Sequence, residues 1–364
     1  MVPSLVSKSS VVIDCRWIGY SGVGRITELL LAGLNELSPP GAWTLWGPLS
    51  VEAYAWPSAK VVAHDASPTH WAAQRDVLSV PKADITMWMH AARPLVPSRS
   101  LVLLHDLIPL HFGSAVRRRA WRLFLSRSCR QATIVAVNSD ATARALANEL
   151  GVQSPTKVSY PLDRDRANRI RSLRSRRGGR SRLMLYVGQV KPHKNLRRAV
   201  DGYLASRFCA DGGAFSILAG GAVDPSEMAL LRSTIAATRG GRMEILSHCT
   251  EDELDQLYGS AAMLIQPSLE EGYGLPVVEA LAGGIPVCCS DIGPLREAAH
   301  GEARLFDPLS TSSIASAIDE VASMAAAGFV PDIPLMPTRM QFAQEFVEMI
   351  ERAARSGQAA SASA

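Results

Sequence analysis

Short apolar runs alternate with longer amphipathic segments along most of the chain, and no other feature restricts its fold as strongly. A short apolar run predicts a buried strand, whereas apolar residues repeating every three or four positions predict a helix. In the first half, helix-like segments at 24–37 and 139–150 come between or after the strands. The strand-like runs there are VVIDCRW (11–17), ADITMWMH (83–90), SLVLLHD (100–106) and ATIVAVNS (132–139).

The same pattern restarts at residue 182. Its strand-like runs are RLMLYVGQ (182–189), AFSILAGG (214–221), RMEILSH (242–248), AMLIQPS (262–268) and ARLFDP (303–308), with helices expected after Asn195, near 225–238, at 251–261 and near 311–327. Two such series predict an α/β fold of two Rossmann-like doubly wound domains that face a central cleft, where ligands bind at the carboxyl ends of the strands. A chain of 364 residues, 47% of them hydrophobic, can bury two cores of this kind.

An arginine-rich stretch separates the two series. Residues 164–182 contain nine arginines and one acid, Asp165, so removing this net charge of +8 from the total of +4 leaves the rest at −4. Such a run is typical of a solvated linker, and contact with phosphate or anionic lipid is the weaker alternative. We therefore expect an N-terminal domain at 1–163, a linker at 164–181 and a C-terminal domain at 182–335.

Two further segments complete this division. Residues 336–364 predict a helix over MQFAQEFVEMIERAARS followed by a frayed tail, GQAASASA. A second basic segment, RRRAWRLFLSRSCR (117–130), predicts a helix with Val116, Ala120, Leu123 and Phe124 along one stripe. We expect that stripe to pack on the N-terminal sheet, while the exposed arginines leave contact with a membrane surface as an alternative.

Cysteine and histidine usage indicates no disulfide framework and no zinc site. The six cysteines have neither metal-ligand spacing nor the density of a disulfide-rich protein, which indicates a reducing cytosol. His64, Asp65, His70, His90 and His111 show no zinc spacing either, so we interpret them as structural. The N-terminus lacks a signal-peptide pattern, and no apolar run is long enough to span a bilayer, so we expect a soluble or peripheral protein.

The segment EEGYGLPVVEALAGG (270–284) carries the strongest indication of function. Pro276 suits the start of a helix that Gly283 and Gly284 end, and neither Gly274 nor Leu275 has a side-chain oxygen to cap it. The first backbone N–H groups are therefore expected to bind an anion such as a diphosphate.

Two carboxylates flank this anion site in the sequence. Glu279, one turn inside the helix, can accept hydrogen bonds from two ribose hydroxyls, and Glu271, before the turn, can face a sugar. The structural alternative is that Glu279 only complements the helix dipole and that Gly-Leu-Pro is only a tight connection.

The wider sequence resembles family 4 glycosyltransferases, which are retaining enzymes of the two-Rossmann-domain GT-B type. EGYGLPVVE (271–279) is similar to their Glu, seven residues, Glu signature, and AGGIPVCCSDIGPLRE (282–297) continues the pattern. The resemblance runs in order from about residue 11 to 310 and includes SGVGR (21–25), HDLIPLHF (105–112), NSDATARAL (138–146) and LYVGQVKPHKN (185–195).

The resemblance implies a role for individual residues. Lys194 would neutralise the diphosphate of the leaving nucleotide, Glu271 would contact the transferred sugar, and His105 would lie beside that sugar. Glu279 would bind the ribose, and Gly22 and Gly24 would form a loop near donor or acceptor. The donor site would also include His193, Gly272, Tyr273, Gly274 and Leu275, while the C-terminal helix would cross back to an N-terminal, acceptor-side domain.

One position departs from the family pattern. Relatives often carry arginine before the lysine, where this chain has Pro192-His193-Lys194-Asn195. Because the charge of histidine depends on pH, either Lys194 and the helix start bind the diphosphate, or activity is sensitive to pH below neutrality.

The resemblance also implies a reaction and its setting. A hexose, best mannose or a related sugar from a GDP donor, would be transferred with retention to a lipid-linked saccharide or polysaccharide in cell-surface glycan biosynthesis. No cofactor is expected, and the resemblance implies that the transfer is independent of metal. We expect a cytoplasmic protein with peripheral contact to the anionic inner membrane and no nucleic-acid partner, because the arginines lack interleaved aromatic residues.

Two rival functions stay open at this point. A nucleotide-sugar epimerase of the same fold would release free nucleotide without an acceptor. A degenerate partner subunit would bind a nucleotide-sugar without turning it over, and His193 is the one substitution that favours it.

Overall fold

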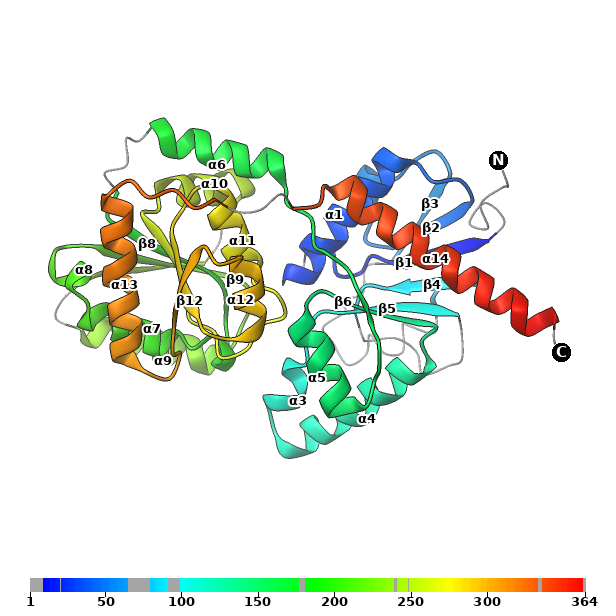
Figure 1. Cartoon of the computed structure of the whole chain (residues 1–364), viewed down its shortest axis with the longest axis horizontal. Coiled ribbons are helices and arrows are strands. Elements are labelled where there is room, and N and C mark those ends of the chain that lie inside the picture. The colour runs from blue at the N-terminus through cyan, green and yellow to red at the C-terminus, as the bar shows by residue number, and fades with distance from the viewer. Residues whose placement is uncertain are drawn as a thin grey trace. The chain divides into compact units, whose positions relative to one another are not determined.

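The computed structural model divides into two compact units. Unit 1 comprises Met1–Pro161 and Met336–Ala364, and unit 2 comprises Leu162–Leu335 (Figure 1). The structure describes residues 9–19, 21–64, 79–90, 99–176, 181–238, 241–247, 249–332 and 336–362.

Unit 1 is built on a parallel sheet of seven strands within the described residues, in the order β3-β2-β1-β4-β5-β6-β7. The strands are β1 (Ser10–Asp14), β2 (Ala42–Gly47), β3 (Ala59–Ala63), β4 (Ile85–Trp88), β5 (Ser100–Leu104), β6 (Ile134–Val137) and β7 (Thr156–Lys157). The helices are α1 (Ser21–Leu37), η2 (Leu49–Tyr54), α3 (Ile108–His111), α4 (Ala115–Gln131), α5 (Asp140–Leu150) and α14 (Arg339–Ala362).

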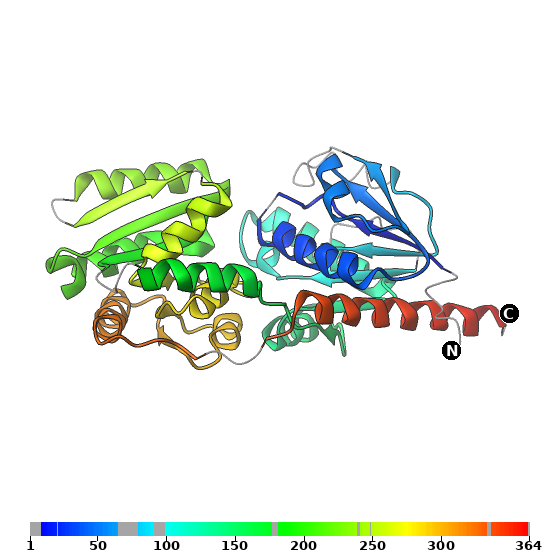
Figure 2. The same ribbon diagram turned by 90° about the horizontal axis from the view of Figure 1, so that it is seen from above.

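The C-terminal helix α14 belongs to unit 1. It packs against α1, and Figure 2 shows the two helices side by side. The contact is close at Gly33 of α1, where a Cβ would lie 2.1 Å from the backbone oxygen of Arg339. Phe342 and Phe346 from α14 are fully buried and pack beside Tyr160.

Unit 2 repeats the architecture with six parallel strands among the described residues, in the order β10-β9-β8-β11-β12-β13. The strands are β8 (Leu183–Val190), β9 (Ala214–Val223), β10 (Arg242–Leu246), β11 (Met263–Gln266), β12 (Val287–Ser290) and β13 (Ala303–Phe306). The helices are α6 (Arg164–Arg176), η4 (Pro192–Lys194), α7 (Leu196–Ala205), α8 (Arg207–Ala210), α9 (Pro225–Ala237), α10 (Glu251–Ser260), α11 (Leu275–Ala282), α12 (Gly293–Ala299) and α13 (Thr311–Ala326).

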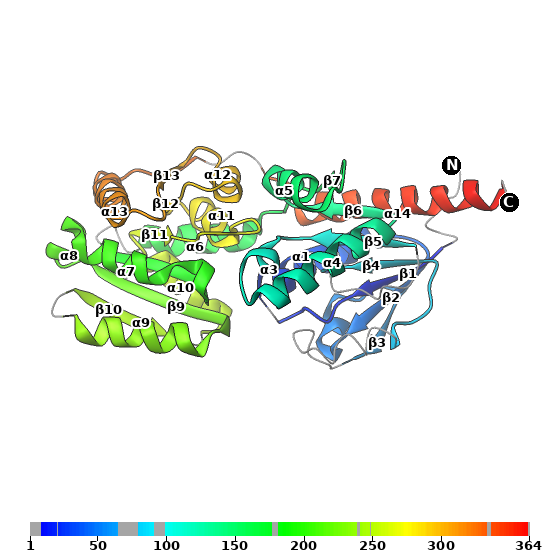
Figure 3. The same cartoon turned by 90° about the horizontal axis from the view of Figure 1, so that it is seen from below.

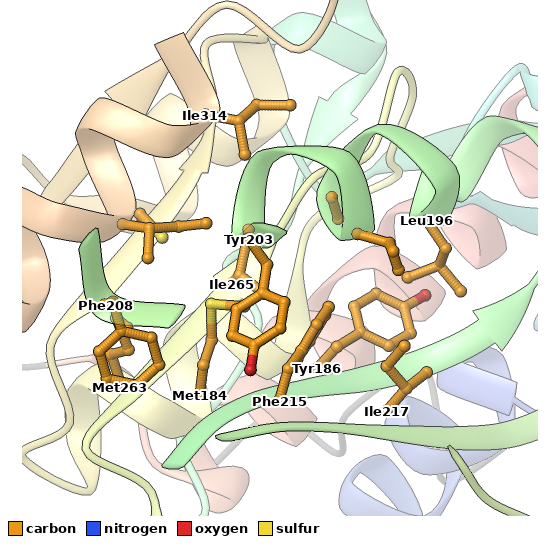
Figure 4. Packing of buried hydrophobic residues seen from close by; sticks show 14 of the residues in the cluster. Met184, Tyr186, Leu196, Tyr203, Phe208, Phe215, Ile217, Met263, Ile265 and Ile314 are labelled. Carbon is orange, nitrogen blue, oxygen red and sulfur yellow. The ribbon is translucent and has the colours of Figure 1, made fainter. Parts of the chain in front are cut away.

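The core of unit 2 lies between its sheet and the packed pair α7 and α13. Figure 4 shows Tyr203 of α7 among the side chains of the neighbouring strands, next to Phe215 and Met184. The hydroxyl of Tyr203 donates to the Gly213 carbonyl at 2.7 Å, so its polar end is satisfied inside the core.

Both sheets have the strand order of a doubly wound fold, which confirms the predicted fold class. In such a sheet the order reverses at one pair of neighbouring strands, and the loops after those strands diverge to form a binding crevice. In unit 2 the pair is β8 and β11, and in unit 1 it is β1 and β4. The structure describes each unit by itself, so the predicted cleft between them stays a prediction.

The predicted linker is wrong. Residues 164–176 form helix α6, which packs on α10 and belongs to unit 2, so the chain enters that unit at Leu162. Four of its arginines, Arg166, Arg169, Arg171 and Arg174, are bound to neighbouring elements. Arg171 donates to the Ala282 carbonyl at 2.6 Å, and Arg174 donates to the Ala261 carbonyl.

Two smaller predictions also need correction. Only part of the apolar stripe of α4 packs as predicted: Phe124 packs against the core beside β5 and β6, whereas Val116 and Leu123 are 79% and 72% exposed. The buried residues of α4 are instead Leu125, Ser128 and Cys129. The tail predicted to fray continues the backbone of α14 as far as Ala362.

The close contact at Gly33 yields a prediction about stability. Gly33→Ala should lower the free energy of unfolding by about 1–3 kcal/mol, because the added methyl group forces α1 and α14 apart. Urea unfolding of the variant measures the change. Gly220→Ala in β9 is the matched control, since a Cβ there meets no atom within 4 Å, and equal stability losses in both variants would contradict the argument.

Candidate functional site

Two loops of unit 2 carry most of the residues singled out in the sequence, and they follow the strands β8 and β11 where the strand order reverses. The loop after β8 contains η4, with His193 and Lys194, and the loop after β11 runs from Pro267 to Gly274. The Leu269 N–H donates to the His193 carbonyl at 2.7 Å, so the backbones of the loops are bonded to each other.

Asn195 fixes the shape of the first loop. Its backbone is left-handed, at φ 56°, a conformation that asparagine tolerates better than most residues. The side-chain amide donates to the carbonyls of Pro267 at 3.0 Å and Pro308 at 2.8 Å. These two bonds connect the loops after β8, β11 and β13 and bring Lys194 toward Glu271.

Lys194 and Glu271 form a largely buried ion pair. The Lys194 Nζ lies 2.6 Å from Glu271 Oε1, and the same oxygen accepts from Gln266 Nε2 and from Ser268 Oγ, each at 2.7 Å. Burial would raise the pKa of Glu271, but the charge of Lys194 and the hydrogen bonds from Lys194 and Ser268 outweigh it and lower the pKa. Glu271 is therefore ionised at neutral pH and held by three donors.

The second carboxylate lies on helix α11, whose start agrees with the prediction. Gly274 precedes the helix at φ 104°, Pro276 is in its first turn, and no side chain caps it. A Cβ on Gly274 would also lie 2.6 Å from a methyl carbon of Leu295, so both the backbone conformation and the packing require glycine.

Glu279 lies in this helix and has two partners that sequence reasoning missed. Its Oε1 accepts from Arg166 Nη1 of α6 at 3.1 Å, and its Oε2 accepts from the Tyr258 hydroxyl of α10 at 2.9 Å. Each carboxylate oxygen has two lone pairs, so both oxygens can still accept a further hydrogen bond. The arrangement leaves Glu279 able to receive hydroxyl donors from a ligand.

Four residues of this site were not singled out from the sequence, which carries a signal for only two of them, Gln266 and Ser268. Arg166 and Tyr258 lie far from Glu279 in the chain, and a run of arginines is typical of a solvated linker. Gln266 and Ser268 end the predicted strand AMLIQPS, so their place at a strand end was the available signal.

His193 does not behave as the sequence led us to expect. It is buried, and burial together with the charges of Lys194 and Lys191 lowers its pKa to about 4, although Glu271 acts in the opposite direction. The side chain is therefore neutral near pH 7. Of the two explanations offered for the missing arginine, this lowered pKa favours diphosphate binding by Lys194 and the helix start.

His105 lies in unit 1, after β5, with partners on both ring nitrogens. Its Nε2 donates to the Met89 carbonyl at 2.8 Å, so Nδ1 accepts from the Tyr160 hydroxyl at 2.5 Å. Burial lowers the pKa of His105 to about 4. The ring is neutral with both nitrogens occupied, and the predicted contact with a sugar stays a prediction.

The glycines of SGVGR also differ from expectation. Ser21–Leu37 is one helix, so Gly22 and Gly24 lie in its first turn rather than in a loop. A Cβ on Gly24 would lie 2.3 Å from the Trp17 carbonyl oxygen, which explains the glycine by packing. Gly272 and Tyr273 lie in the loop before α11, as predicted, and burial followed by the charge of Glu297 raises the pKa of Tyr273 to about 12.

The histidines interpreted as structural have local partners. His90 stacks on Trp17, His64 stacks on Trp46, and His111 bonds to Glu149 at 3.0 Å. Asp65 and His70 lie outside the described residues. Across the described ranges no group of three or more His, Cys, Asp or Glu side chains could hold a metal ion.

Comparison with known proteins shows which family the second half of the chain resembles. Residues 172–327 match the family model described as glycosyl transferases group 1. This segment includes Lys194, Glu271 and Glu279. The whole chain has the GT-B fold of glycosyltransferases, as the solved structures described below indicate.

The relatives include mannosyltransferases of bacterial surface glycans. The chain is 28% identical over 138 residues to O-antigen chain mannosyltransferase B of Escherichia coli, a match covering 37% of this chain and 35% of that protein. It is 24% identical to O-antigen chain mannosyltransferase RfbU of Salmonella typhimurium, over 70% of each chain. It is 27% identical to the lipopolysaccharide core biosynthesis mannosyltransferase LpsB of Rhizobium meliloti, over 67% of this chain and 69% of that protein.

Solved structures agree on the fold. Sucrose-phosphate synthase from Thermosynechococcus elongatus superposes with a TM-score of 0.68 at 16% identity, covering 96% of this chain and 97% of that one. Anabaena HepE in complex with UDP and glucose gives 0.64 at 16% identity, covering 94% and 98%. WaaG, a glycosyltransferase involved in lipopolysaccharide biosynthesis, gives 0.62 at 12% identity, covering 95% and 94%.

The lowered pKa of the buried His105 yields a prediction of how the free energy of unfolding depends on pH. Burial lowers the pKa of His105 to about 4, so between pH 6.5 and 4 the unfolded chain binds a proton that the folded chain does not. The free energy of unfolding should therefore fall as the pH falls through this window. A difference of one in pKa between the two states corresponds to about 1.4 kcal/mol.

His105→Gln should make that decline shallower, because the neutral amide can still donate to Met89 and accept from Tyr160. Urea unfolding of wild type and variant at pH 7, 6, 5 and 4.5 measures the difference in slope. Identical slopes would show that His105 does not contribute.

Proposed function

We propose that this protein is a retaining glycosyltransferase that transfers a hexose, best mannose, from a GDP-sugar to a lipid-linked saccharide or polysaccharide. The match of residues 172–327 to glycosyl transferases group 1 and the similarity to mannosyltransferases support this class of activity. The observation that carries the proposal is the placement of Lys194, Glu271 and Glu279 around the loops where the strand order of unit 2 reverses.

The diphosphate of the donor would bind beside the start of α11. Gly274 lets the backbone approach it, the helix has no side-chain cap, and the helix dipole favours its charge. Lys194 would exchange its bond to Glu271 for one to a phosphate oxygen. Glu279 would accept hydrogen bonds from the two ribose hydroxyls.

Bond breaking would place negative charge on the phosphate. As the bond between the anomeric carbon and the phosphate oxygen breaks, Lys194 stabilises the charge that builds on the departing nucleoside diphosphate. The acceptor hydroxyl bonds to the same face of the anomeric carbon, and its proton passes to the departing phosphate oxygen. Glu271, still bonded to Gln266 and Ser268, would accept hydrogen bonds from hydroxyls of the transferred sugar.

Lys194 supplies the positive charge in this scheme, so we propose that transfer needs no divalent metal and no other cofactor. Addition of EDTA to the purified enzyme should leave the rate of mannose transfer unchanged. A rate that falls with EDTA and is restored by Mg²⁺ or Mn²⁺ would contradict the proposal of metal-independent transfer.

Calorimetric titration with GDP, UDP and TDP tests the donor. GDP should bind more tightly than the other two, and Glu279→Ala should weaken GDP binding by about tenfold or more, because hydrogen bonds from two hydroxyls to a charged group are lost. Preferential binding of UDP or TDP would show that the donor is not a GDP-sugar, while the glycosyltransferase activity would remain the proposal. No binding of any of the three would favour a degenerate subunit.

Measurement of kcat tests whether the charge of Lys194 stabilises the leaving group. Lys194→Gln should lower kcat by about 10²–10³, since it removes a charge that acts mainly in the transition state. Arg197→Gln, an exposed cation in the following helix, is the matched control because it removes the same charge nearby. An equal loss of kcat in both variants would contradict the leaving-group role.

We also propose that the protein binds the anionic cytoplasmic surface of the inner membrane through α4. Val116 and Leu123 lie seven residues apart on the outward side of this helix, with exposed Arg119, Arg127 and Arg130 on the same side. Helix α4 has no acidic residue. Exposed apolar side chains flanked by arginines fit the boundary of anionic headgroups and acyl chains.

The contact proposed here is peripheral. No helix among the described residues is both long and apolar enough to cross a membrane. Figure 3 shows α4 beside α3 in unit 1, and Arg122 on another side of α4 is already paired with Glu149 at 3.1 Å. The outward arginines therefore supply the attraction to lipid.

Sedimentation with vesicles tests this surface. The protein should sediment with vesicles of phosphatidylcholine and phosphatidylglycerol, less with phosphatidylcholine alone, and less at high salt because the attraction is screened. Val116→Glu combined with Leu123→Glu should reduce binding severalfold. Leu309→Glu, at a residue of unit 2 that is 65% exposed, is the matched control, and an equal effect there would contradict the assignment to α4.

A further inference from the structure

Arg166 is a buried arginine in a segment whose sequence suggested solvated charge. It lies in the first turn of α6, four residues after the chain enters unit 2 at Leu162, and its side chain is 3% exposed. The Arg166 N–H is bonded to the Asp163 carboxylate at 3.0 Å, which holds the start of the helix. The backbone of Arg166 is therefore held in place at the start of the helix.

Three carboxylates surround this guanidinium. Nε donates to Asp255 Oδ1 at 2.7 Å, and Nη1 lies 3.1 Å from Glu279 Oε1 and 3.4 Å from Glu251 Oε2. The guanidinium carbon is 5.7 Å from the centre of the Tyr258 ring, and the Tyr258 hydroxyl donates to the other oxygen of Glu279. Arg166 thus connects α6 to α10 and to the carboxylate of α11.

Stability alone is a poor explanation for this arrangement. Removing two charges from water costs free energy that their attraction often fails to recover, so a buried ion pair is weak support for a stabilising role. Arg166 also leaves its Nη2 buried and without a hydrogen-bond partner among the described residues, which adds a further cost. A purely structural contact would be better served by a smaller or apolar side chain.

We propose that Arg166 is a positioning residue for nucleoside binding, acting through Glu279. Together with Tyr258 it fixes the orientation of the Glu279 carboxylate, so that the remaining lone pairs of both oxygens face the ribose hydroxyls. This inference rests on the proposed function, because it needs Glu279 to contact the ribose. The inference adds that a residue of helix α6, outside the Glu, seven residues, Glu signature, increases the affinity for the nucleoside.

Because Arg166 acts through Glu279, its effect must require both the carboxylate and the hydroxyls. Arg166→Met should weaken GDP binding by about tenfold in the wild-type background and much less when Glu279 is already alanine. It should also have little effect on 2′,3′-dideoxy-GDP, which lacks both hydroxyls. An indirect loss of folding would weaken binding of both nucleotides equally.

Arg169→Met is the matched control. Arg169 comes from the same helix and donates to the other oxygen of Asp255 at 3.0 Å, but it makes no bond to Glu279 among the contacts of the described residues. This variant should retain GDP affinity within about twofold. Arg166→Lys should restore part of the affinity lost in Arg166→Met, because it returns the charge but not a guanidinium that bonds to Asp255 and Glu279 at the same time.

Calorimetric dissociation constants for GDP and 2′,3′-dideoxy-GDP in each variant decide the question. A loss specific to GDP in Arg166→Met that disappears in the Glu279→Ala background supports the proposal. Equal losses for both nucleotides, or equal losses in Arg169→Met, overturn it.

Failure of the proposed function gives a different result. If Glu279→Ala leaves GDP affinity unchanged, the ribose role of Glu279 is wrong; if only Arg166→Met is without effect, the ribose role stands and the positioning role falls. Should Arg166→Met not fold, Tyr258→Phe removes the other hydrogen bond to Glu279 with little change of shape. An unchanged preference of Tyr258→Phe for GDP over its dideoxy analogue would overturn the claim that these partners orient Glu279.

Discussion

Buried charge at the ends of parallel strands is the constraint on which unit 2 depends. A carboxylate removed from water must be paired with a cation or hydrogen-bond donors, since an isolated buried charge is very costly. Glu271 is paired with Lys194 and Glu279 with Arg166, and in each case the cation comes from a different segment of the chain. The two pairings bring the η4 loop and helix α6 to the two ends of the glutamate signature.

The doubly wound sheet makes these pairings possible. Because β8 and β11 are parallel neighbours, the loops that follow them emerge at the same edge, and Asn195 and the Leu269 N–H then connect them. The glycine before α11 has a backbone conformation that L side chains rarely adopt, which leaves the helix start uncovered by a side chain. The fold thus supplies the loops, and local hydrogen bonds determine which side chains meet.

Much of this arrangement follows from sequence periodicity, and the exceptions have physical causes. The strands at 214–223 and 263–266 and helix α11 agree closely with expectation, because their apolar patterns and turn residues are local signals. Strands β2 and β3 were not predicted. Helix α6 was misjudged because charge runs are usually solvated, whereas Arg166 is paired with acids 89 and 113 residues away. Periodicity cannot reveal partners at such separations.

The convergence of donors on Glu271 bears on how binding could proceed. Gln266, Ser268 and Lys194 all donate to the same oxygen of Glu271. This oxygen therefore has two donors in addition to the lysine of the ion pair. In the proposed reaction Lys194 turns to the diphosphate, and Glu271 would be left buried and charged if the lysine were its sole partner. The two neutral donors keep the carboxylate hydrogen-bonded during that exchange, which lowers the free energy needed to free the lysine. The resting ion pair and the proposed donor complex are therefore compatible with the same hydrogen bonds from Gln266 and Ser268 to Glu271.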